Sequence, residues 1–308
     1  MTDVVTPQSV QVYYDVEDSY ADGGSAGSPD FAWVGIIQDA PQSFTNNKRQ
    51  CRGIGSVDVN SLADGLQSPE ITLKWIVQRK RTVATAFNPA TLLAYANTFP
   101  TYGLGIEWLT TYGATPSYVS LWYKGMLMDS LDVEFSIDSF ITATAKFIGH
   151  SIVDGTEGVG NSYATNPINL ANSYALPLTG YDAEVFYNAA GGADTALTKV
   201  KSVRFSIKNK LRRIPVIQTS NSTYLKYIEK GQRELTGEIV CYMEDKTEYA
   251  HLLDATALDI RIDLQKTDNT PYFNFTGCKL DTGSISTNLT TVPCEVTLPF
   301  VATGISIG

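Results

Sequence analysis

The sequence predicts a mainly β protein made of two similar β-rich modules, each with one short helix packed on a sheet. Its 308 residues are 43% hydrophobic and 18% charged, which is typical of a globular chain long enough for two domains with their own cores. Seventeen Tyr and 12 Phe, together with many Thr, Val and Ile residues, favour strands. Similar segments also recur in the same order in the two halves, which indicates two modules acting side by side.

Four matched blocks carry this internal repeat. The segment GMLMD at 125–129 and the alternating run that follows it match GCKLD at 277–281 and the run up to residue 307. A second matched block is a strand that places Glu70 opposite Glu238. The remaining blocks pair QVYYD with EVFYN, and FAWVGIIQD with SVRFSIKN. The offset between the copies only decreases along the chain, as expected for two copies whose loops differ in length.

In the first module we expect strands at 9–16 and 31–38, separated by a turn rich in Gly, Ser and Asp. A long polar loop at 39–55 follows, and alternating segments at 57–59 and 70–77 predict two half-buried strands. Residues 88–97 predict a helix, because Asn88 is a good N-cap, Pro89 suits the first helical position, and three apolar residues form a stripe. A closing set of strands ends near residue 152.

The second module repeats this order, with a helix predicted at 245–254. Asp245 is its expected N-cap, and Glu248 occupies the capping-box position. Between the modules, a segment rich in Gly, Asn and Ser predicts a linker. The predicted organisation is therefore a first module at 1–153, a linker at 154–175 and a second module at 176–308.

The net charge of −9 is unevenly distributed. Residues 1–174 carry 9 Lys or Arg and 17 Asp or Glu, a net −8, whereas residues 175–308 carry 14 and 15, a net −1. An acidic chain is poorly suited to gripping DNA, because affinity for phosphates comes from Lys and Arg. It suits a surface that nucleic acid passes without sticking. The sequence has neither a run of about 20 apolar residues nor a secretory signal, so we expect no membrane association and no export.

The sequence offers little for catalysis or metal binding. The two histidines, His150 and His251, have no catalytic or metal-ligand spacing around them, and both phosphate-binding glycine motifs are absent. The acidic group Asp15, Glu17, Asp18 and Asp22 has the wrong gaps for a calcium loop and is interpreted as a solvated turn. We therefore predict a protein that is not an enzyme and has no catalytic residues, no metal and no cofactor.

The four cysteines have no metal-binding spacing and are expected to be small buried hydrophobes, with a disulfide between Cys278 and Cys294 as the alternative.

Basic residues gather in the long loop of each copy. They are either solvated hairpin residues or contacts to an acidic face of a neighbouring subunit, since complementary charge fixes register in an assembly. The candidate contact residues are Lys48, Arg49 and Arg52 in the first loop and Lys208, Lys210, Arg212 and Arg213 in the second.

The order and lengths of these segments resemble the tail tube proteins of long-tailed bacteriophages and archaeal viruses, in the form with two fused tail-tube modules in one chain. The resemblance covers nearly the whole chain. It depends on the order of sheet and single helix, on the long loop after the second strand, and on the matched strands at 70–77 and 238–243 and closing segments at 118–152 and 272–307.

This resemblance implies β-sandwich or half-barrel modules, each with one short flanking α-helix, and a duplicated tail-tube fold. It implies a homotrimer, a pseudo-hexameric ring, that stacks through the long loops into a tube through which double-stranded DNA passes. The expected partners are the chain itself and the tape measure, tail terminator and baseplate proteins. The expected location is the virion tail, after assembly in the host cytoplasm.

Two alternatives remain open from the sequence. A single-ring tail protein, such as a baseplate hub, distal tail or tail terminator protein, would share the module. A glycan- or receptor-binding β-sandwich would use an aromatic platform made of Trp108, Tyr112, Tyr118, Trp122 and Tyr123.

Overall fold

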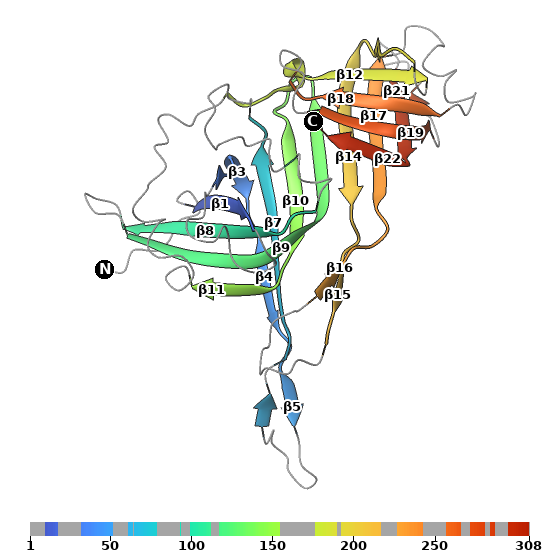
Figure 1. Cartoon of the computed structure of the whole chain (residues 1–308). Helices are drawn as coiled ribbons and strands as arrows, with labels where there is room; N and C mark the ends of the chain where they lie inside the picture. The colour runs from blue at the N-terminus through green and yellow to red at the C-terminus, as the bar shows by residue number, and fades with distance from the viewer. Residues whose placement is uncertain are drawn as a thin grey trace.

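The structure is a computed structural model of the chain, and it describes the residue ranges given next. They are 10–17, 32–51, 61–63, 65–78, 93, 99–111, 117–154, 176–189, 192–216, 227–242, 257–265, 272–280, 284–286 and 295–307. These residues form antiparallel sheets (Figure 1), which confirms the mainly β fold class. The two predicted flanking helices lie outside the described residues, apart from Leu93, which is helical and buried. Within the described residues, no helix has the length and hydrophobicity needed to cross a bilayer.

The described part of the first half contains eleven strands. They are β1 (Val10–Val16), β2 (Ala32–Trp33), β3 (Ile36–Asp39), β4 (Gln42–Asn46), β5 (Arg49–Cys51), β6 (Ser61–Ala63), β7 (Gln67–Ile76), β8 (Tyr102–Thr111), β9 (Ser117–Ser136), β10 (Thr142–Ile148) and β11 (Ser151–Asp154).

The second half begins with a short 3₁₀ turn, η3 (Gly180–Asp182), and continues with the strands that follow. They are β12 (Glu184–Ala189), β13 (Thr195–Ala196), β14 (Val200–Lys208), β15 (Arg212–Ile214), β16 (Tyr227–Glu229), β17 (Glu234–Tyr242), β18 (Leu258–Asp263), β19 (Tyr272–Leu280), β20 (Ser284–Ser286), β21 (Glu295–Ala302) and β22 (Gly304–Ile307).

The strands of the two halves pair in the same order. In the first half β1 pairs with β8, β8 with β9, and β9 with both β10 and β11, while β7 lies between β10 and the β3–β4 edge. In the second half β12 pairs with β18, β18 with β19, and β19 with both β21 and β22, while β17 lies between β21 and β14. Each half also carries a separate two-stranded hairpin, β5–β6 or β15–β16.

Each half therefore has two layers that share one bent strand. In Figure 1, β8 and β11 run across the direction of β7 and β10, and β9 continues from one layer into the other. The bend lies at Gly125 (φ 63°) in β9 and at Gly277 (φ 60°) in β19, in a conformation that glycine adopts readily. A buried carboxylate holds the first bend, because the Gly125 N–H donates to Glu17 at 2.8 Å; the Gly277 N–H donates to Asp259 at 2.9 Å.

Aromatic side chains fill the space between the layers. In the first half, Tyr102 packs edge-on against Tyr14 and Phe147, with ring centroids 6.3 and 5.8 Å away. In the second half, Phe205 and Phe300 each pack against Phe275. Burial of these rings contributes much of the hydrophobic stabilisation.

Strand register fixes which residues of the two halves correspond. Phe147 lies opposite Met128 and Ile71, and Phe300 lies opposite Leu280 and Gly237. Ile71 therefore corresponds to Gly237, and Glu70 corresponds to Thr236. The sequence alignment that placed Glu70 opposite Glu238 is wrong by two residues, a shift that leaves the alternation of faces unchanged.

The first described residues after the predicted linker pair with strands of the first half. Leu178 is fully buried, donates its N–H to the Val77 carbonyl at 2.8 Å, and accepts the Ile141 N–H at 2.9 Å. The start of the predicted second module is thus tied to the layer that contains β7 and β10.

Candidate assembly interface

The two halves are joined by a pairing between β9 and β14. Seven consecutive residue pairs connect these strands, from Ser202 opposite Ser136 to Lys208 opposite Ser130. This inner junction merges one layer of each half into a single antiparallel sheet, here called the shared sheet. Its strand order is β3–β4, β7, β10, β9, β14, β17, β21 and β20.

One face of the shared sheet is apolar and buried across the inner junction. Leu131 lies opposite Ile207, and Val133 lies opposite Phe205; all four side chains are buried. Because side chains alternate between faces, the residues between them form the opposite, polar face. The alternation thus builds one continuous core wall from both halves.

The polar face carries nearly balanced charge. Its acidic members among the described residues are Asp39, Glu70, Asp132, Glu134, Glu234, Glu238 and Glu295; its basic members are Lys74, Lys146, Lys201, Arg204, Lys208 and Lys279. Ion pairs join Lys74 to Glu134 at 3.8 Å and Lys201 to Glu295. The strongly acidic balance of the first half is therefore not reproduced on this face.

Opposite charges also stand across the inner junction itself. Arg204 in β14 lies directly opposite Glu134 in β9 and opposite Glu238 in β17. Cross-strand pairs of opposite charge stabilise a sheet by a few tenths of a kcal/mol to about 1 kcal/mol. A basic residue between two acidic ones favours this register over neighbouring ones.

A buried polar cluster closes one end of the inner junction. Asn209, which is 1% exposed, donates its side-chain N–H to the Met128 carbonyl at 2.8 Å and its backbone N–H to the Asp129 carbonyl at 2.7 Å. The Arg233 guanidinium donates to the Asn209 side-chain oxygen at 3.1 Å, and the Leu211 N–H donates to the Asp129 carboxylate at 2.8 Å. Sequence reasoning missed Asn209, although an Asn ends the matching strand of each copy before the basic residues.

A second polar group spans the two halves nearby. The Arg213 guanidinium donates to Glu70 at 2.7 Å, and Lys146 lies 3.2 Å from the same carboxylate. Partial burial alone would raise the pKa of Glu70, but the hydrogen bonds from Arg213 and Lys146 outweigh it and place the pKa below its ordinary value. Glu70 is thus held ionised between two cations.

The predicted basic loop residues fall into three groups. Lys210 pairs with Glu234 at 2.6 Å and Arg213 pairs with Glu70, so both make ion pairs within the chain. Lys48, Lys208 and Arg212 are exposed. The backbone of Arg49 begins β5, and Arg52 lies outside the described residues.

The hairpins that carry these loops extend from the same end of the molecule. Figure 1 shows β5 and the β15–β16 hairpin at the lower end, beyond the shared sheet. Cation–ring contacts brace the base of the second hairpin, since Lys230 and Arg233 each lie 4.6 Å from the centroid of Phe99, a residue of the first half. The hairpins are thus placed where another copy of the molecule could reach them.

Two sequence interpretations are corrected by burial. Trp122 and Tyr123 are 1% and 2% exposed, so they are core residues and cannot form the sugar-stacking platform of the alternative hypothesis. Asp15 and Glu17 are buried and not part of a solvated acidic turn; Asp18 and Asp22 lie outside the described residues. The Gly125 N–H donates a hydrogen bond to the Glu17 carboxylate, and this bond lowers the cost of removing the carboxylate from water.

The cysteine expectation is confirmed for two of the four residues. Cys241 and Cys278 are free buried thiols, and burial raises the pKa of Cys278 to about 12. No group of three or more His, Cys, Asp or Glu side chains within the described residues is arranged to hold a metal ion.

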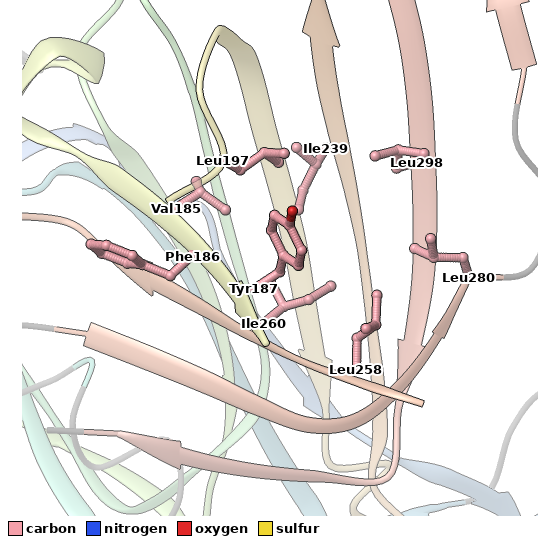
Figure 2. Close-up of a pocket in the computed structure, with 9 residues that line it drawn as sticks. All are labelled: Val185, Phe186, Tyr187, Leu197, Ile239, Leu258, Ile260, Leu280 and Leu298. Atoms are coloured by element: carbon pink, nitrogen blue, oxygen red, sulfur yellow. The ribbon is translucent and has the colours of Figure 1, made fainter. Parts of the chain in front are cut away.

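The second half contains an apolar pocket between its layers. Figure 2 shows the nine lining side chains, which are Val185, Phe186, Tyr187, Leu197, Ile239, Leu258, Ile260, Leu280 and Leu298. Leu258 lies opposite Ala189 and Cys278, as Tyr102 lies opposite Val16 and Met126 in the first half. The larger, fully buried Tyr102 ring occupies this position in the first half.

Comparison with known proteins identifies the family. Among solved structures, the chain is similar to the tail of an empty gene transfer agent particle with C6 symmetry, at 10% identity and a TM-score of 0.34, over 42% of this chain and 98% of that chain. It is also similar to the SPP1 tail tube, at 14% identity and a TM-score of 0.33, over 43% and 79%. The anti-feeding prophage baseplate matches at 13% identity and a TM-score of 0.36, over 50% and 97%.

No curated protein matches the chain. A sequence model described as phage tail tube protein matches residues 4–304, which is nearly the entire chain. The chain therefore belongs to the phage tail tube protein family.

Proposed function

We propose that this chain is a structural virion protein whose copies form trimeric, pseudo-hexameric rings that stack into a viral tail tube. The observation that carries the proposal is the inner junction, in which β9 of the first half pairs with β14 of the second half. That pairing already joins two similar sandwiches edge to edge within one chain. Repeating it between chains would close a ring and leave no edge of the shared sheet exposed.

In this proposal each half is one tail-tube module, with the first at 1–153, a linker at 154–175 and the second at 176–308. Support comes from the equal pairing order of the two halves and from the matched bends at Gly125 and Gly277. Three chains, each with two fused modules, would then supply the six modules of a ring.

The polar face of the shared sheet would line the lumen, and double-stranded DNA would pass along it without sequence-specific binding. Its Lys and Arg side chains stand beside carboxylates, as Lys74 does with Glu134 and Arg204 does with Glu134 and Glu238. A cation that is already paired releases fewer DNA counterions on contact with phosphate, so it holds DNA weakly. A balanced and paired wall therefore favours sliding over binding.

The two long hairpins would contact the next ring in the stack. Exposed Lys48, Lys208 and Arg212 suit contact with an acidic face, and Arg49 and Arg52 belong to the corresponding loop. Lys210 and Arg213 would act differently, since their ion pairs within the chain orient the second hairpin. No cofactor or catalytic residue takes part.

The proposed partners are further copies of this chain and the tape measure, tail terminator and baseplate proteins. The proposed location is the virion tail, after assembly in the host cytoplasm. A single-ring tail protein, such as a baseplate hub, distal tail or tail terminator protein, is the second candidate, because its ring would use the same edges without stacking.

Negative-stain electron microscopy of the concentrated protein, with light scattering for mass, tests this proposal. Hollow tubes with a regular axial repeat and three chains per ring are expected. Trimeric rings that never elongate, even when added to isolated tail ends, would assign the protein to a single-ring role. A chain that stays monomeric under all these conditions would contradict both.

A further inference from the structure

The two outer strands of the shared sheet each have one open side. Among the described strands, β4 pairs only with β7, and β20 pairs only with β21. Such edges present unpaired backbone N–H and C=O groups that accept another strand. They lie at opposite ends of the same sheet, so one copy's β4 can meet another copy's β20.

Register identifies each edge with a strand of the inner junction. Thr297 corresponds to Thr144, because Phe300 corresponds to Phe147. Since Ser284 lies opposite Thr297 and Asp132 lies opposite Thr144, β20 corresponds to the part of β9 that forms the inner junction.

The same reasoning applies to the other edge. Gln42 lies opposite Ile71, and Phe205 lies opposite Gly237, the residue that corresponds to Ile71. Hence Gln42 corresponds to Phe205 and the strand β4 corresponds to the end of β14. The inner junction is therefore a template for a junction between β20 and β4.

We propose that the β20 edge of one copy pairs antiparallel with the β4 edge of a second copy, with Ser284 opposite Ser43 and Ile285 opposite Gln42. This register is that of the inner junction, in which Asp132 lies opposite Ser206 and Val133 lies opposite Phe205. The inference rests on the proposed ring and specifies the residues of its seam between chains.

Asn46 supplies an independent observation at this seam. It corresponds to Asn209, since Gln42 corresponds to Phe205 and each Asn lies four residues further along its chain. In the inner junction, Asn209 binds the Met128 carbonyl and Arg233. At the open edge, the side-chain oxygen of Asn46 is buried without a hydrogen-bond partner among the described residues.

Gln67, the residue that corresponds to Arg233, also has a buried polar atom without a hydrogen-bond partner among the described residues. The atom is the side-chain oxygen of Gln67. Buried polar atoms are normally hydrogen-bonded. The donor to the Asn209 oxygen, Arg233, belongs to the same half as Asn209, so the two orphaned oxygens show that the polar cluster is incomplete at β4. The bond that crosses the inner junction is the one from the Asn209 side-chain N–H to Met128. At the seam, the expected acceptor for the Asn46 side-chain N–H is therefore the Leu280 carbonyl of the second copy, which corresponds to that of Met128.

The bases of the two hairpins confirm that these positions correspond. A Cβ atom at Gly65 would lie 1.7 Å from the Asn47 carbonyl oxygen, and one at Gly231 would lie 2.2 Å from that of Lys210. The same close backbone approach therefore follows Asn46 and Asn209, and a glycine lies just before each returning strand, β7 or β17.

Cysteine cross-linking tests the register. In a background with Cys51→Ser and Cys294→Ser that still assembles, the variant Ser43→Cys with Ser284→Cys is oxidised and run on a non-reducing gel. Covalent dimers and trimers are expected, with little material above the trimer, because opposite residues bring their Cβ atoms within disulfide range. Ser43→Cys with Ser286→Cys, displaced by two residues, is the mismatched control, and each single variant is run beside it.

The variant Asp132→Cys with Ser206→Cys is the positive control, because it should yield a cross-linked monomer in the inner junction. Rings in the microscope without the matched chain-to-chain cross-link, or with the mismatched one favoured, would overturn the register and leave the proposed function standing. Absence of both rings and cross-links would overturn both.

Asn46→Ala provides a second measurement. Its thermal midpoint should equal that of the parent chain, while the concentration needed for assembly rises about fivefold to tenfold, as loss of one buried hydrogen bond predicts. Asn47→Ala, next to it but bonded to Leu66 within the same chain, should not change the assembly concentration. Equal assembly of Asn46→Ala and the parent would contradict the role of Asn46 in the seam.

Discussion

Arg213 of the second half donates a 2.7 Å hydrogen bond to Glu70 of the first half, across 143 residues of sequence. Arg213→Ala should lower the free energy of unfolding by about 0.5–1.5 kcal/mol, since the pair is only partly shielded from water. Urea unfolding at pH 7 measures this change. Arg212→Ala, which alters an exposed neighbour in the same strand, is the matched control and should be close to neutral.

The same pair predicts a pH dependence. Because the pKa of Glu70 is lowered in the folded state, its stabilisation is present above the ordinary value near 4.5 and is lost as the pH falls through the lowered value. The difference between the parent and Arg213→Ala should therefore shrink below about pH 4. A constant difference across this range would show that Arg213 acts through packing alone.

Asn209→Ala should destabilise the single chain, in contrast to Asn46→Ala. Its side chain is buried and bonds the Met128 carbonyl across the inner junction, so its removal leaves a buried acceptor without a donor. The expected loss is about 1–3 kcal/mol in the free energy of unfolding. Differential scanning calorimetry of both variants checks the contrast, and equal midpoints for the two would argue against an inner junction of the observed form.

Glu107 predicts a loss of stability as the pH rises. It is 3% exposed, and burial raises its pKa to about 7, although a hydrogen bond from Tyr13 favours the ionised form. Between about pH 4.5 and 7 the unfolded chain releases this proton while the folded chain keeps it, so the free energy of unfolding decreases with pH and levels off above 7.

Glu107→Gln should remove that slope and stabilise the chain at pH 8 by up to about 3 kcal/mol. Chemical unfolding at pH 5 and pH 8 measures it, with the exposed Glu238→Gln as control. An unchanged slope in Glu107→Gln would assign the pH dependence to other groups.

The two bends should respond alike to side chains. Gly125→Ala and Gly277→Ala each force an L residue into the left-handed region, at a cost of about 1–2 kcal/mol. Gly277→Ala should cost more, because its Cβ atom would lie 2.3 Å from the Thr303 hydroxyl. Gly125→Asn should recover part of the loss, since Asn tolerates this conformation. Thermal unfolding of the three variants checks this order, and a neutral Gly125→Ala would contradict it.

The strand content and the match between the two glycine-containing segments could be predicted from the sequence, because both are local patterns. The bend at each glycine, inside a strand, was not predicted. Alternation sets which side chain faces the core, and a Gly at the same place in GMLMD and GCKLD marks a backbone that other residues adopt at a cost. The displacement of Glu70 relative to Glu238 shows the limit of such patterns. A shift by two residues leaves every side chain on the same face of the sheet, so the correct alignment of the two copies can be read only from the pairing with neighbouring strands.

Partners across the fold could not be predicted in this way. Alternation in β14 predicts two faces but does not name β9 as its neighbour. The burial of Glu17 depends on a backbone N–H more than 100 residues away, and the pairing of Arg213 with Glu70 depends on the inner junction. Basic residues that the sequence grouped together, because they lie in the two long loops, therefore divide into paired and exposed groups.

The inner junction forms within one polypeptide, so its formation is a first-order process that does not depend on protein concentration. A ring closed by three such chains would depend on the third power of the monomer concentration, where six separate modules would depend on the sixth. Covalent linkage thus makes ring nucleation far less sensitive to dilution. In the proposed ring it would also enforce strict alternation of the two halves, so a change in β4 would alter every second seam and leave the others intact.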